Sequence, residues 1–221
     1  MNTRGLKVTG PLLAAMAVAC GSGSTPTAPT EAPPRRQIVV LGDSLAVSPS
    51  REQAFPALLQ ARIRQHGLSW PIVNAGVNGD TTAGGLRRVD ALLTGDTAIL
   101  VLALGANDGL RGVAVSTVEQ NLDAIIERAK ARNVRVLLCG METPPFNGWD
   151  YTVAFHRLFP SLAAKHDVPL VPFLLAGVAL NPELNGADGI HPNAAGAQRI
   201  ADTIWPHLEP MLPARRVTAL R

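Results

Sequence analysis

Two stretches of the chain consist almost entirely of aliphatic residues, and they decide which folds are open to it. Residues 37–41 read Gln-Ile-Val-Val-Leu, and residues 98–104 read Ala-Ile-Leu-Val-Leu-Ala-Leu. An uninterrupted apolar run is typical of a strand that is covered on both faces, whereas a half-exposed strand alternates apolar and polar residues. Shorter runs complete a set of five expected strands, at residues 71–74, 134–139 and 168–171.

Segments with helical spacing separate these strands. They cover residues 52–66, 82–93, 116–132, 150–166 and 192–209. Ser116 and Glu119 predict a capping box, Pro160 is expected to break or kink its helix, and Pro192 is expected at the first position of the last helix. The alternation predicts an α/β fold: three layers, α/β/α, around a five-stranded parallel sheet in the flavodoxin-like order 2-1-3-4-5.

The first 35 residues follow a different pattern. Residues 1–20 combine two basic residues with a short apolar stretch and a small-residue cleavage site, which predicts an export signal. Cys20 stands at the cleavage point and resembles the lipidated Cys of a bacterial lipobox, with ordinary secretion as the alternative. Residues 21–35 are expected to form a disordered linker, residues 36–214 the domain and residues 215–221 a tail. The expected location is the bacterial periplasm or cell surface.

Composition excludes several classes of protein. The chain has 221 residues, of which 47% are hydrophobic, so one domain with a full apolar core is expected. The formal net charge is +3, but Lys and Arg are scattered and aromatic residues make up only 4%. This pattern does not suit a nucleic-acid-binding surface. Two cysteines cannot form a disulfide scaffold, and no Cys/His spacing fits a zinc site.

In open α/β sheets, ligands bind beyond the carboxyl ends of the strands, so the loops after the five strands are where a site is expected. The first of these loops carries Ser44, which a sharp turn would expose as a nucleophile; alternatively, Asp43 or Ser44 caps the next helix. The second carries Gly79, whose backbone N–H can face a ligand. A tight turn with Asp80 as a helix cap is the alternative there.

Two further loops carry polar residues that complete a catalytic set. Asn107 follows the third strand and can direct its side-chain NH₂ at a developing oxyanion, or can form an Asx-turn. Asp188 and His191 stand three residues apart before the last helix, a spacing that allows a hydrogen bond fixing the imidazole tautomer. The alternative for His191 is a polar helix cap. Together the four loops supply a nucleophile, a base, its partner and oxyanion donors at one sheet edge.

Four sequence blocks resemble the GDSL or SGNH hydrolase family, in order, over residues 37–212. The blocks are V-L-G-D-S-L at 40–45, N-A-G-V-N-G-D-T-T-A-G-G-L at 74–86, L-G-A-N-D-G-L-R-G at 104–112 and D-G-I-H-P-N at 188–193. They are most similar to the bacterial thioesterase I/lysophospholipase/arylesterase branch. Residues 46–50, Ala-Val-Ser-Pro-Ser, depart from that branch, so we expect a differently shaped entrance beside the first block.

The resemblance implies a serine esterase that acts on carboxylic esters or thioesters through an acyl-enzyme. It implies Ser44 as nucleophile, His191 as base and Asp188 as its partner, with an oxyanion hole from the N–H groups of Ser44 and Gly79 and the side chain of Asn107. Neither metal nor organic cofactor is expected. The substrate-binding residues expected near the acyl group are Gly109, Leu110, Phe146, Trp149 and Tyr151, with packing as the alternative for the three aromatic residues.

The expected partner is a small-molecule ester or thioester, with no nucleic acid, and with membrane contact only through a lipid at Cys20. A monomer is expected. Three other functions are weighed against the esterase. They are a carbohydrate O-deacetylase of the wider family, a non-catalytic surface lipoprotein, and a nucleotide-binding domain. The last is disfavoured because no strand is followed by G-x-x-x-x-G-K-[ST] or G-x-G-x-x-G.

Overall fold

The computed structural model describes Met1 and residues 36–213. The chain divides into residues 1–33 and residues 34–221, and the second unit holds the fold. The predicted signal segment, Cys20, the linker and the C-terminal tail from residue 215 lie outside the described residues. No helix among the described residues is long and apolar enough to cross a membrane.

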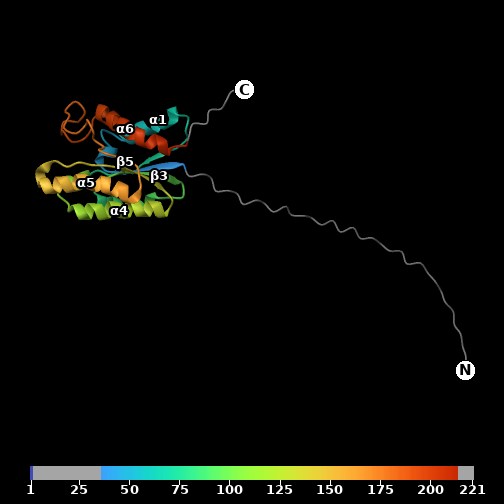
Figure 1. Ribbon diagram of the computed structural model, residues 1–221. Helices are drawn as coiled ribbons and strands as arrows, with labels where there is room; N and C mark the ends of the chain where they lie inside the picture. Colours follow the sequence, from blue (N-terminus) through green and yellow to red (C-terminus); the bar gives the residue numbers. More distant parts are fainter. Residues whose placement is uncertain (2–35, 214–221) are drawn as a thin grey trace. The chain divides into compact units, whose positions relative to one another are not determined.

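The sheet has the five strands and the order that the apolar runs predict (Figure 1). Its strands are β1 (Gln37–Gly42), β2 (Ile72–Asn74), β3 (Thr97–Ala103), β4 (Arg135–Cys139) and β5 (Leu170–Val171). They lie in the order β2-β1-β3-β4-β5, and every neighbouring pair is parallel. All residues of β3 are buried, and β1 is buried from Ile38 to Gly42. This burial is the reason for their uninterrupted apolar sequences.

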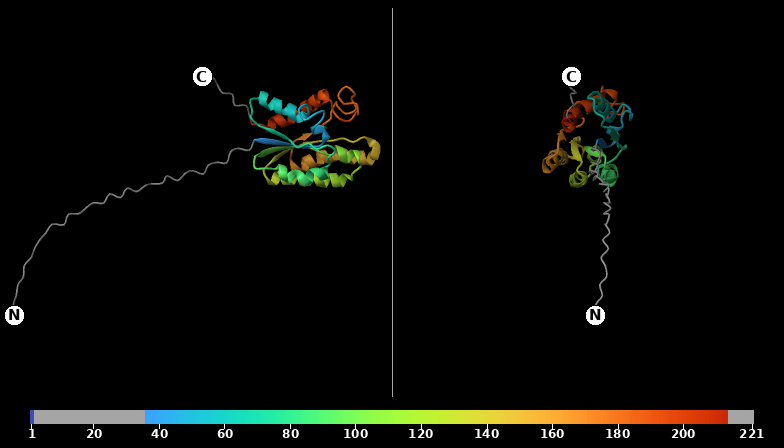
Figure 2. Two further views of the ribbon diagram at one scale, coloured as in Figure 1. Left: turned by 180° about the vertical axis from the view of Figure 1, so that it is seen from behind. Right: turned by 90° about the vertical axis from the view of Figure 1, so that its right-hand side faces the viewer.

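Helices cover both faces of the sheet (Figures 1 and 2). The long helices are α1 (Phe55–Gln65), α2 (Thr82–Leu92), α4 (Val115–Ala131), α5 (Trp149–His166) and α6 (Ala194–Leu208). Helix α1 packs beside α6 on one face, and α2, α4 and α5 lie on the other. Shorter pieces are α3 (Ala106–Leu110) and the 3₁₀ turns η1 (Ser44–Ala46), η2 (Pro145–Asn147) and η3 (Glu209–Met211). The α/β/α architecture is therefore confirmed.

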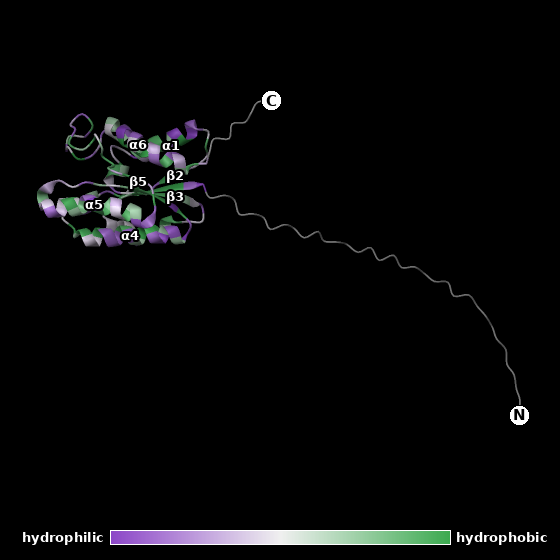
Figure 3. Ribbon diagram, viewed as in Figure 1, coloured by the Kyte–Doolittle hydropathy of each residue, from purple (hydrophilic) through white to green (hydrophobic). Residues whose placement is uncertain are grey.

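The core lies where the helices meet the sheet. Colouring by hydropathy shows largely apolar strands between helices that carry both polar and apolar residues (Figure 3). Phe55 of α1 is fully buried on one side, and Phe155 and Phe159 of α5 are buried on the other with their rings 5.6 Å apart. Burying a large apolar side chain of this kind stabilises a fold by about 1.5–3 kcal/mol. The two layers of core hold the strand ends in place.

Three local expectations about the helices are wrong. Helix α4 begins at Val115, so Ser116 lies inside its first turn and no side chain caps it. Helix α6 begins at Ala194 with Asn193 as its cap, so Pro192 precedes the helix. Helix α5 continues through Pro160, so the expected break is absent there, while a kink at Pro160 stays a prediction. That proline lies on the exposed side of the helix, where the carbonyl it leaves without an N–H partner can face water.

Candidate active site

Ser44 stands at a sharp turn where β1 ends and η1 begins. The carboxylate of Asp43 accepts the backbone N–H of Leu45 at 2.9 Å and so caps this turn. The turn also depends on Gly42, because a Cβ atom there would lie 2.9 Å from the Cβ of Ala46. Asp43 therefore has the capping role that was expected as the alternative. Ser44 is not the cap, and its hydroxyl faces His191.

The structure brings Ser44, His191 and Asp188 into one hydrogen-bonded line. The Nε2 atom of His191 lies 2.9 Å from the Ser44 Oγ, and its Nδ1 lies 2.6 Å from the Asp188 Oδ2. With the proton on Nδ1, the imidazole donates to the carboxylate and accepts the hydroxyl proton on Nε2. This arrangement can therefore remove a proton from the serine and later return one.

Several bonds hold the Asp188 carboxylate and its loop. Its Oδ1 accepts the backbone N–H groups of Ile190 and His191, at 2.9 and 3.0 Å. The hydrogen bond from the His191 ring, followed by these backbone bonds, holds the pKa of Asp188 well below its ordinary value. The Gly186 N–H donates to the His191 carbonyl at 2.8 Å and closes the loop. The helix cap after this loop is Asn193, so His191 is not the cap.

The three expected oxyanion donors line one cavity together with the triad. Gly79 has a φ of +69°, a conformation that favours glycine. Asn107 lies on the short helix α3 that follows β3, not in an irregular loop. A cavity of about 770 Å³ is lined by all five of these residues: Ser44, Gly79, Asn107, Asp188 and His191.

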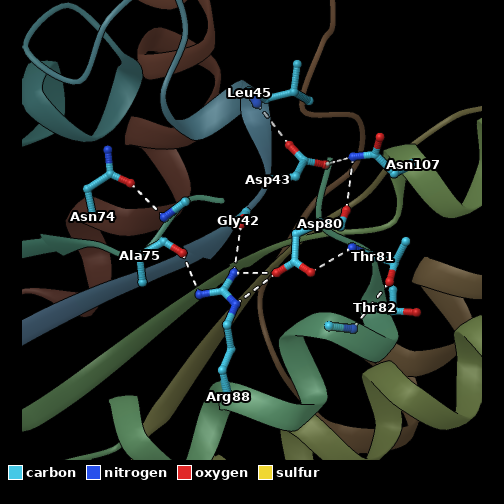
Figure 4. A network of polar contacts seen from close by, with 12 residues as sticks. Gly42, Asp43, Leu45, Asn74, Ala75, Asp80, Thr81, Thr82, Arg88 and Asn107 are labelled. Atoms are coloured by element: carbon cyan, nitrogen blue, oxygen red, sulfur yellow. Dashed lines mark hydrogen bonds and ion pairs between the residues drawn. The ribbon is translucent and has the colours of Figure 1, made fainter. Parts of the chain in front are cut away.

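Both protons of the Asn107 amide are engaged within the protein (Figure 4). Its Nδ2 donates to the backbone carbonyl of Asp80 at 3.0 Å and to the Asp43 Oδ2 at 3.3 Å. These acceptors lie in two other loops of the site, so the amide is not closed into an Asx-turn of its own. The longer of the two bonds is the one that an incoming oxygen can replace with least loss.

The alternative expected for this loop, with Asp80 as the cap of helix α2, is wrong. Thr81 is the cap, and its side chain accepts the N–H of Gly84 at 3.3 Å. The Asp80 carboxylate instead accepts from the guanidinium of Arg88, at 2.8 Å (Figure 4). No sequence pattern pointed to Arg88, because a basic residue on a helix is usually an exposed one.

Asp43 is a fully buried carboxyl group beside the nucleophile. Burial is the largest influence on its pKa and raises it from 3.8 to about 6, against the opposing effect of the bonds from Leu45 and Asn107. At neutral pH the site therefore contains a buried negative charge within reach of the Asn107 amide. That charge is stabilised by hydrogen bonds, because the carboxylate accepts a backbone and a side-chain donor.

The cavity is also lined by residues to which the sequence analysis gave no part in the site. In addition to the catalytic set, they are Ser48, Pro49, Asn78, Gly186, Ala187, Pro192 and Asn193. Ser48 and Pro49 belong to the segment 46–50, where the sequence departs from the branch it resembles, and that departure was the available signal. Gly186 and Ala187 directly precede Asp188.

The five expected substrate-binding residues are not among the residues lining this cavity. Gly109 is buried, and its carbonyl accepts from Asn147 at 2.9 Å. Tyr151 donates to the Val113 carbonyl at 2.8 Å and stacks on a neighbouring ring of α5, so its packing role is real. The other three are exposed: Leu110 by 47%, Phe146 by 79% and Trp149 by 72%. A role for them in substrate binding stays a prediction.

Other histidines also pair with carboxylates, but without a serine in the line. His156 lies 2.7 Å from Glu142, and His166 lies 2.6 Å from Asp123. Both pairs join separate elements and could not be found from local spacing. Within residues 36–213, no group of three His, Cys, Asp or Glu side chains could hold a metal ion. Cys139 is buried with a free thiol.

Comparison with known proteins identifies the relatives of this chain. The pattern of the GDSL-like lipase/acylhydrolase family matches residues 40–199. Esterase TesA of Pseudomonas aeruginosa is 42% identical over 178 residues, which cover 79% of this chain and 89% of that protein. A crystal structure of TesA has a TM-score of 0.76 to this chain, covering 80% of this chain and 99% of that one.

Two further relatives match a similar share of this chain. Thioesterase 1/protease 1/lysophospholipase L1 of Escherichia coli strain K12 is 39% identical over 79% of this chain and 84% of that protein. The crystal structure of psychrotrophic esterase EstA from Pseudoalteromonas sp., inhibited by monoethylphosphonate, has a TM-score of 0.75 at 30% identity. It matches 79% of this chain and 97% of that one. The family match at residues 40–199 lies within the domain that carries the site.

Replacing Asp43 with Asn tests the effect of the buried carboxylate on stability. Because its pKa is raised from 3.8 to about 6, the folded state binds this proton more tightly than the unfolded state does. The resulting stabilisation is complete below about pH 4 and is lost as the pH rises through about 6. The free energy of unfolding of the wild type, relative to Asp43→Asn, should therefore fall by about 2–3 kcal/mol between about pH 4 and 7.5.

Urea denaturation of both proteins at a series of pH values measures this difference. Subtracting the variant removes the contributions of all other titrating groups that the two proteins share. A difference that stays constant across the range would contradict the raised pKa of Asp43.

Proposed function

The chain belongs to the GDSL-like lipase/acylhydrolase family and is a carboxylic ester hydrolase, and from this premise we propose that it works by two-step acyl transfer through Ser44, His191 and Asp188. The observation that carries the proposal is the position of the His191 ring, 2.9 Å from the Ser44 Oγ and 2.6 Å from the Asp188 carboxylate. Because the chain is an ester hydrolase, a non-catalytic surface lipoprotein and a nucleotide-binding domain are no longer considered as its function.

In the first step His191 accepts the proton of Ser44 at Nε2 while the oxygen attacks the ester carbonyl carbon. The imidazolium that forms is stabilised by Asp188, whose carboxylate also holds the ring in the tautomer with a proton on Nδ1. His191 then donates its proton to the leaving alcohol or thiol as the bond to the acyl carbon breaks. An acyl-enzyme on Ser44 is left.

The second step repeats this chemistry with water. His191 takes a proton from a water molecule, which attacks the acyl carbon, and then returns the proton to the Ser44 oxygen as the acid leaves. In both steps the carbonyl oxygen becomes negatively charged. We assign its stabilisation to the N–H groups of Ser44 and Gly79 and to the Asn107 amide, which border the same cavity. For Asn107, binding the oxyanion means exchanging the 3.3 Å bond to Asp43 for a bond to substrate.

We propose carboxylic esters or thioesters as the substrates, because the similar proteins carry the names esterase, thioesterase and lysophospholipase. A carbohydrate O-deacetylase remains the alternative within the wider family. A panel of p-nitrophenyl esters of graded chain length, run beside acyl-CoA, a lysophospholipid and an acetylated sugar, separates these substrates by their kcat/KM.

We also propose that the chain is exported and anchored through a lipid on Cys20, because Cys20 follows a short apolar stretch with a small-residue cleavage site. Metabolic labelling with a palmitate analogue should mark the wild type and not Cys20→Ser. A labelled Cys20→Ser protein, or a wild type that is exported without label, would contradict the anchor.

Ser44→Ala should abolish both ester hydrolysis and labelling by a fluorophosphonate probe, because it removes the only oxygen proposed to attack the substrate. Ser48→Ala is the matched control: Ser48 lines the same cavity, but the proposal gives it no part in the reaction. That variant should keep its label. Equal labelling of Ser44→Ala and wild type would end the proposal.

Asn107→Ala should lower kcat by roughly 10²–10³ with little change in KM, because its amide meets an oxygen that is charged only during attack. Asn121→Ala, which removes an amide bonded to Thr82 at 3.1 Å, controls for the loss of a partly buried hydrogen bond of another asparagine. Steady-state kinetics and thermal midpoints of both variants decide the matter. An Asn107→Ala protein with a lowered midpoint and a nearly normal kcat would show that the residue only supports its loop.

A further inference from the structure

The guanidinium of Arg88 joins two backbone segments that lead into the active site, the end of β1 and the loop after β2 (Figure 4). Arg88 lies on α2, and its Nη2 donates to the Gly42 carbonyl at 2.9 Å. Its Nη1 donates to the Ala75 carbonyl at 2.6 Å, and its Nε to the Asp80 carboxylate at 2.8 Å. All three nitrogens of one planar group are thus used, each on a different residue.

Each of these segments carries or supports an oxyanion donor. Gly42 ends β1, two residues before Ser44. Ala75 opens the loop after β2, and Asp80 directly follows Gly79 in that loop. Arg88 therefore bridges the ends of two neighbouring strands, at the point where each supplies one of the backbone N–H groups assigned to the oxyanion.

The third donor is connected to the same group through Asp80. The Asp80 carbonyl accepts the Asn107 amide at 3.0 Å, while its carboxylate is bonded to Arg88. Room for that carboxylate comes from Gly84 on α2, because a Cβ there would lie 1.7 Å from the Asp80 Oδ1. The Asp80 side chain is only 11% exposed, so its charge is largely removed from water and paired with that of Arg88.

We propose that Arg88 is a positioning residue that fixes the spacing of the three oxyanion donors through its bonds to Gly42, Ala75 and the Asp80 carboxylate. The inference rests on the proposed function, since it concerns the oxyanion hole assigned there. Arg88 itself lies behind the strand ends and donates all its described bonds to protein atoms, so it acts through the residues that it holds.

Arg51 provides a matched comparison on the same loop. Its Nη1 and Nη2 donate to the carbonyls of Asn74 and Gly76, at 3.2 and 3.0 Å. Both acceptors belong to the end of β2 and the loop after it, so Arg51 supports that loop without joining it to β1 or to Asp80. Loss of Arg51 should weaken the loop but leave the spacing of the donors in place.

The test compares Arg88→Ala, Arg88→Lys and Arg51→Ala in kcat, KM and thermal midpoint on one p-nitrophenyl ester. Arg88→Ala should lose about 10–100-fold in kcat with KM nearly unchanged, because a 1 Å displacement of catalytic groups can cost about 10²-fold. Added guanidinium ion at millimolar concentration should recover part of that kcat, and Arg88→Lys should keep an intermediate rate. Arg51→Ala should stay within about threefold of wild type in kcat.

Gly84→Ala perturbs the same network without touching Arg88. The added methyl group displaces the Asp80 carboxylate, while alanine favours the helix over glycine. We expect kcat to fall with KM nearly unchanged in the folded variant, a split that a general loss of stability does not produce. Gly95→Ala is the control, because no atom lies within 4 Å of the added Cβ. If Arg88→Ala fails to fold, Arg88→Lys and Gly84→Ala decide the question.

Ser44→Ala, measured beside these variants, separates this inference from the proposed function. Full activity in Ser44→Ala overturns the proposed function. If Ser44→Ala is inactive but Arg88→Ala and Gly84→Ala keep the wild-type kcat, the inference about Arg88 alone is overturned. It is also overturned if Arg88→Ala and Arg51→Ala lose the same fraction of kcat, since that result indicates general loosening of the loop.

Discussion

Every strand of the sheet runs in the same direction, and the place of each site residue follows from that constraint. Ser44 follows the end of β1, Gly79 lies in the loop after β2 and Asn107 follows β3. The strands are neighbours in the sheet, so these loops meet at one edge. His191 reaches the same edge from the segment before α6. That segment packs closely against α6, because a Cβ at Gly196 of the helix would lie 2.0 Å from the Leu184 carbonyl oxygen.

Hydrogen bonds inside the protein hold the resting site in the form in which it can react. The Asn107 amide donates to a carboxylate and a carbonyl, so a negative oxygen already occupies one of its donor directions before substrate arrives. Asp43, the carboxylate in question, is buried, and its pKa is raised to about 6 by that burial. Catalysis then requires the exchange of one acceptor for another and not the assembly of a new donor. Donors that are positioned in advance in this way stabilise developing charge with little reorganisation beyond that exchange.

The sequence predicted the strands and the Asp188–His191 pair because each depends on a local pattern, whereas the strand order was expected by analogy with the flavodoxin-like fold and the pairing of Ser44 with His191 from the family resemblance. Buried parallel strands require apolar runs, and Asp188 and His191 bond within one turn. The network of Arg88 could not be predicted, because its acceptors come from positions 42, 75 and 80, and two of these acceptors are backbone carbonyls, which carry no sequence signal. Helix ends were also missed, since a start shifted by one residue moves Ser116 from the cap into the first turn of α4. Ser48 and Pro49 line the cavity, and their position there could not be predicted, because no local pattern determines the conformation of segment 46–50.

The most direct test of the account is a crystal structure of the enzyme inactivated by an alkyl phosphonate. The account predicts a bond from phosphorus to the Ser44 Oγ, with the phosphoryl oxygen about 2.7–3.1 Å from the amide nitrogens of Ser44 and Gly79 and from the Asn107 Nδ2. The Asn107 amide should have exchanged its bond to Asp43 for this oxygen while keeping its bond to the Asp80 carbonyl. A phosphonyl group on another residue would contradict the account, and so would a phosphoryl oxygen that faces solvent while Asn107 remains bonded to Asp43.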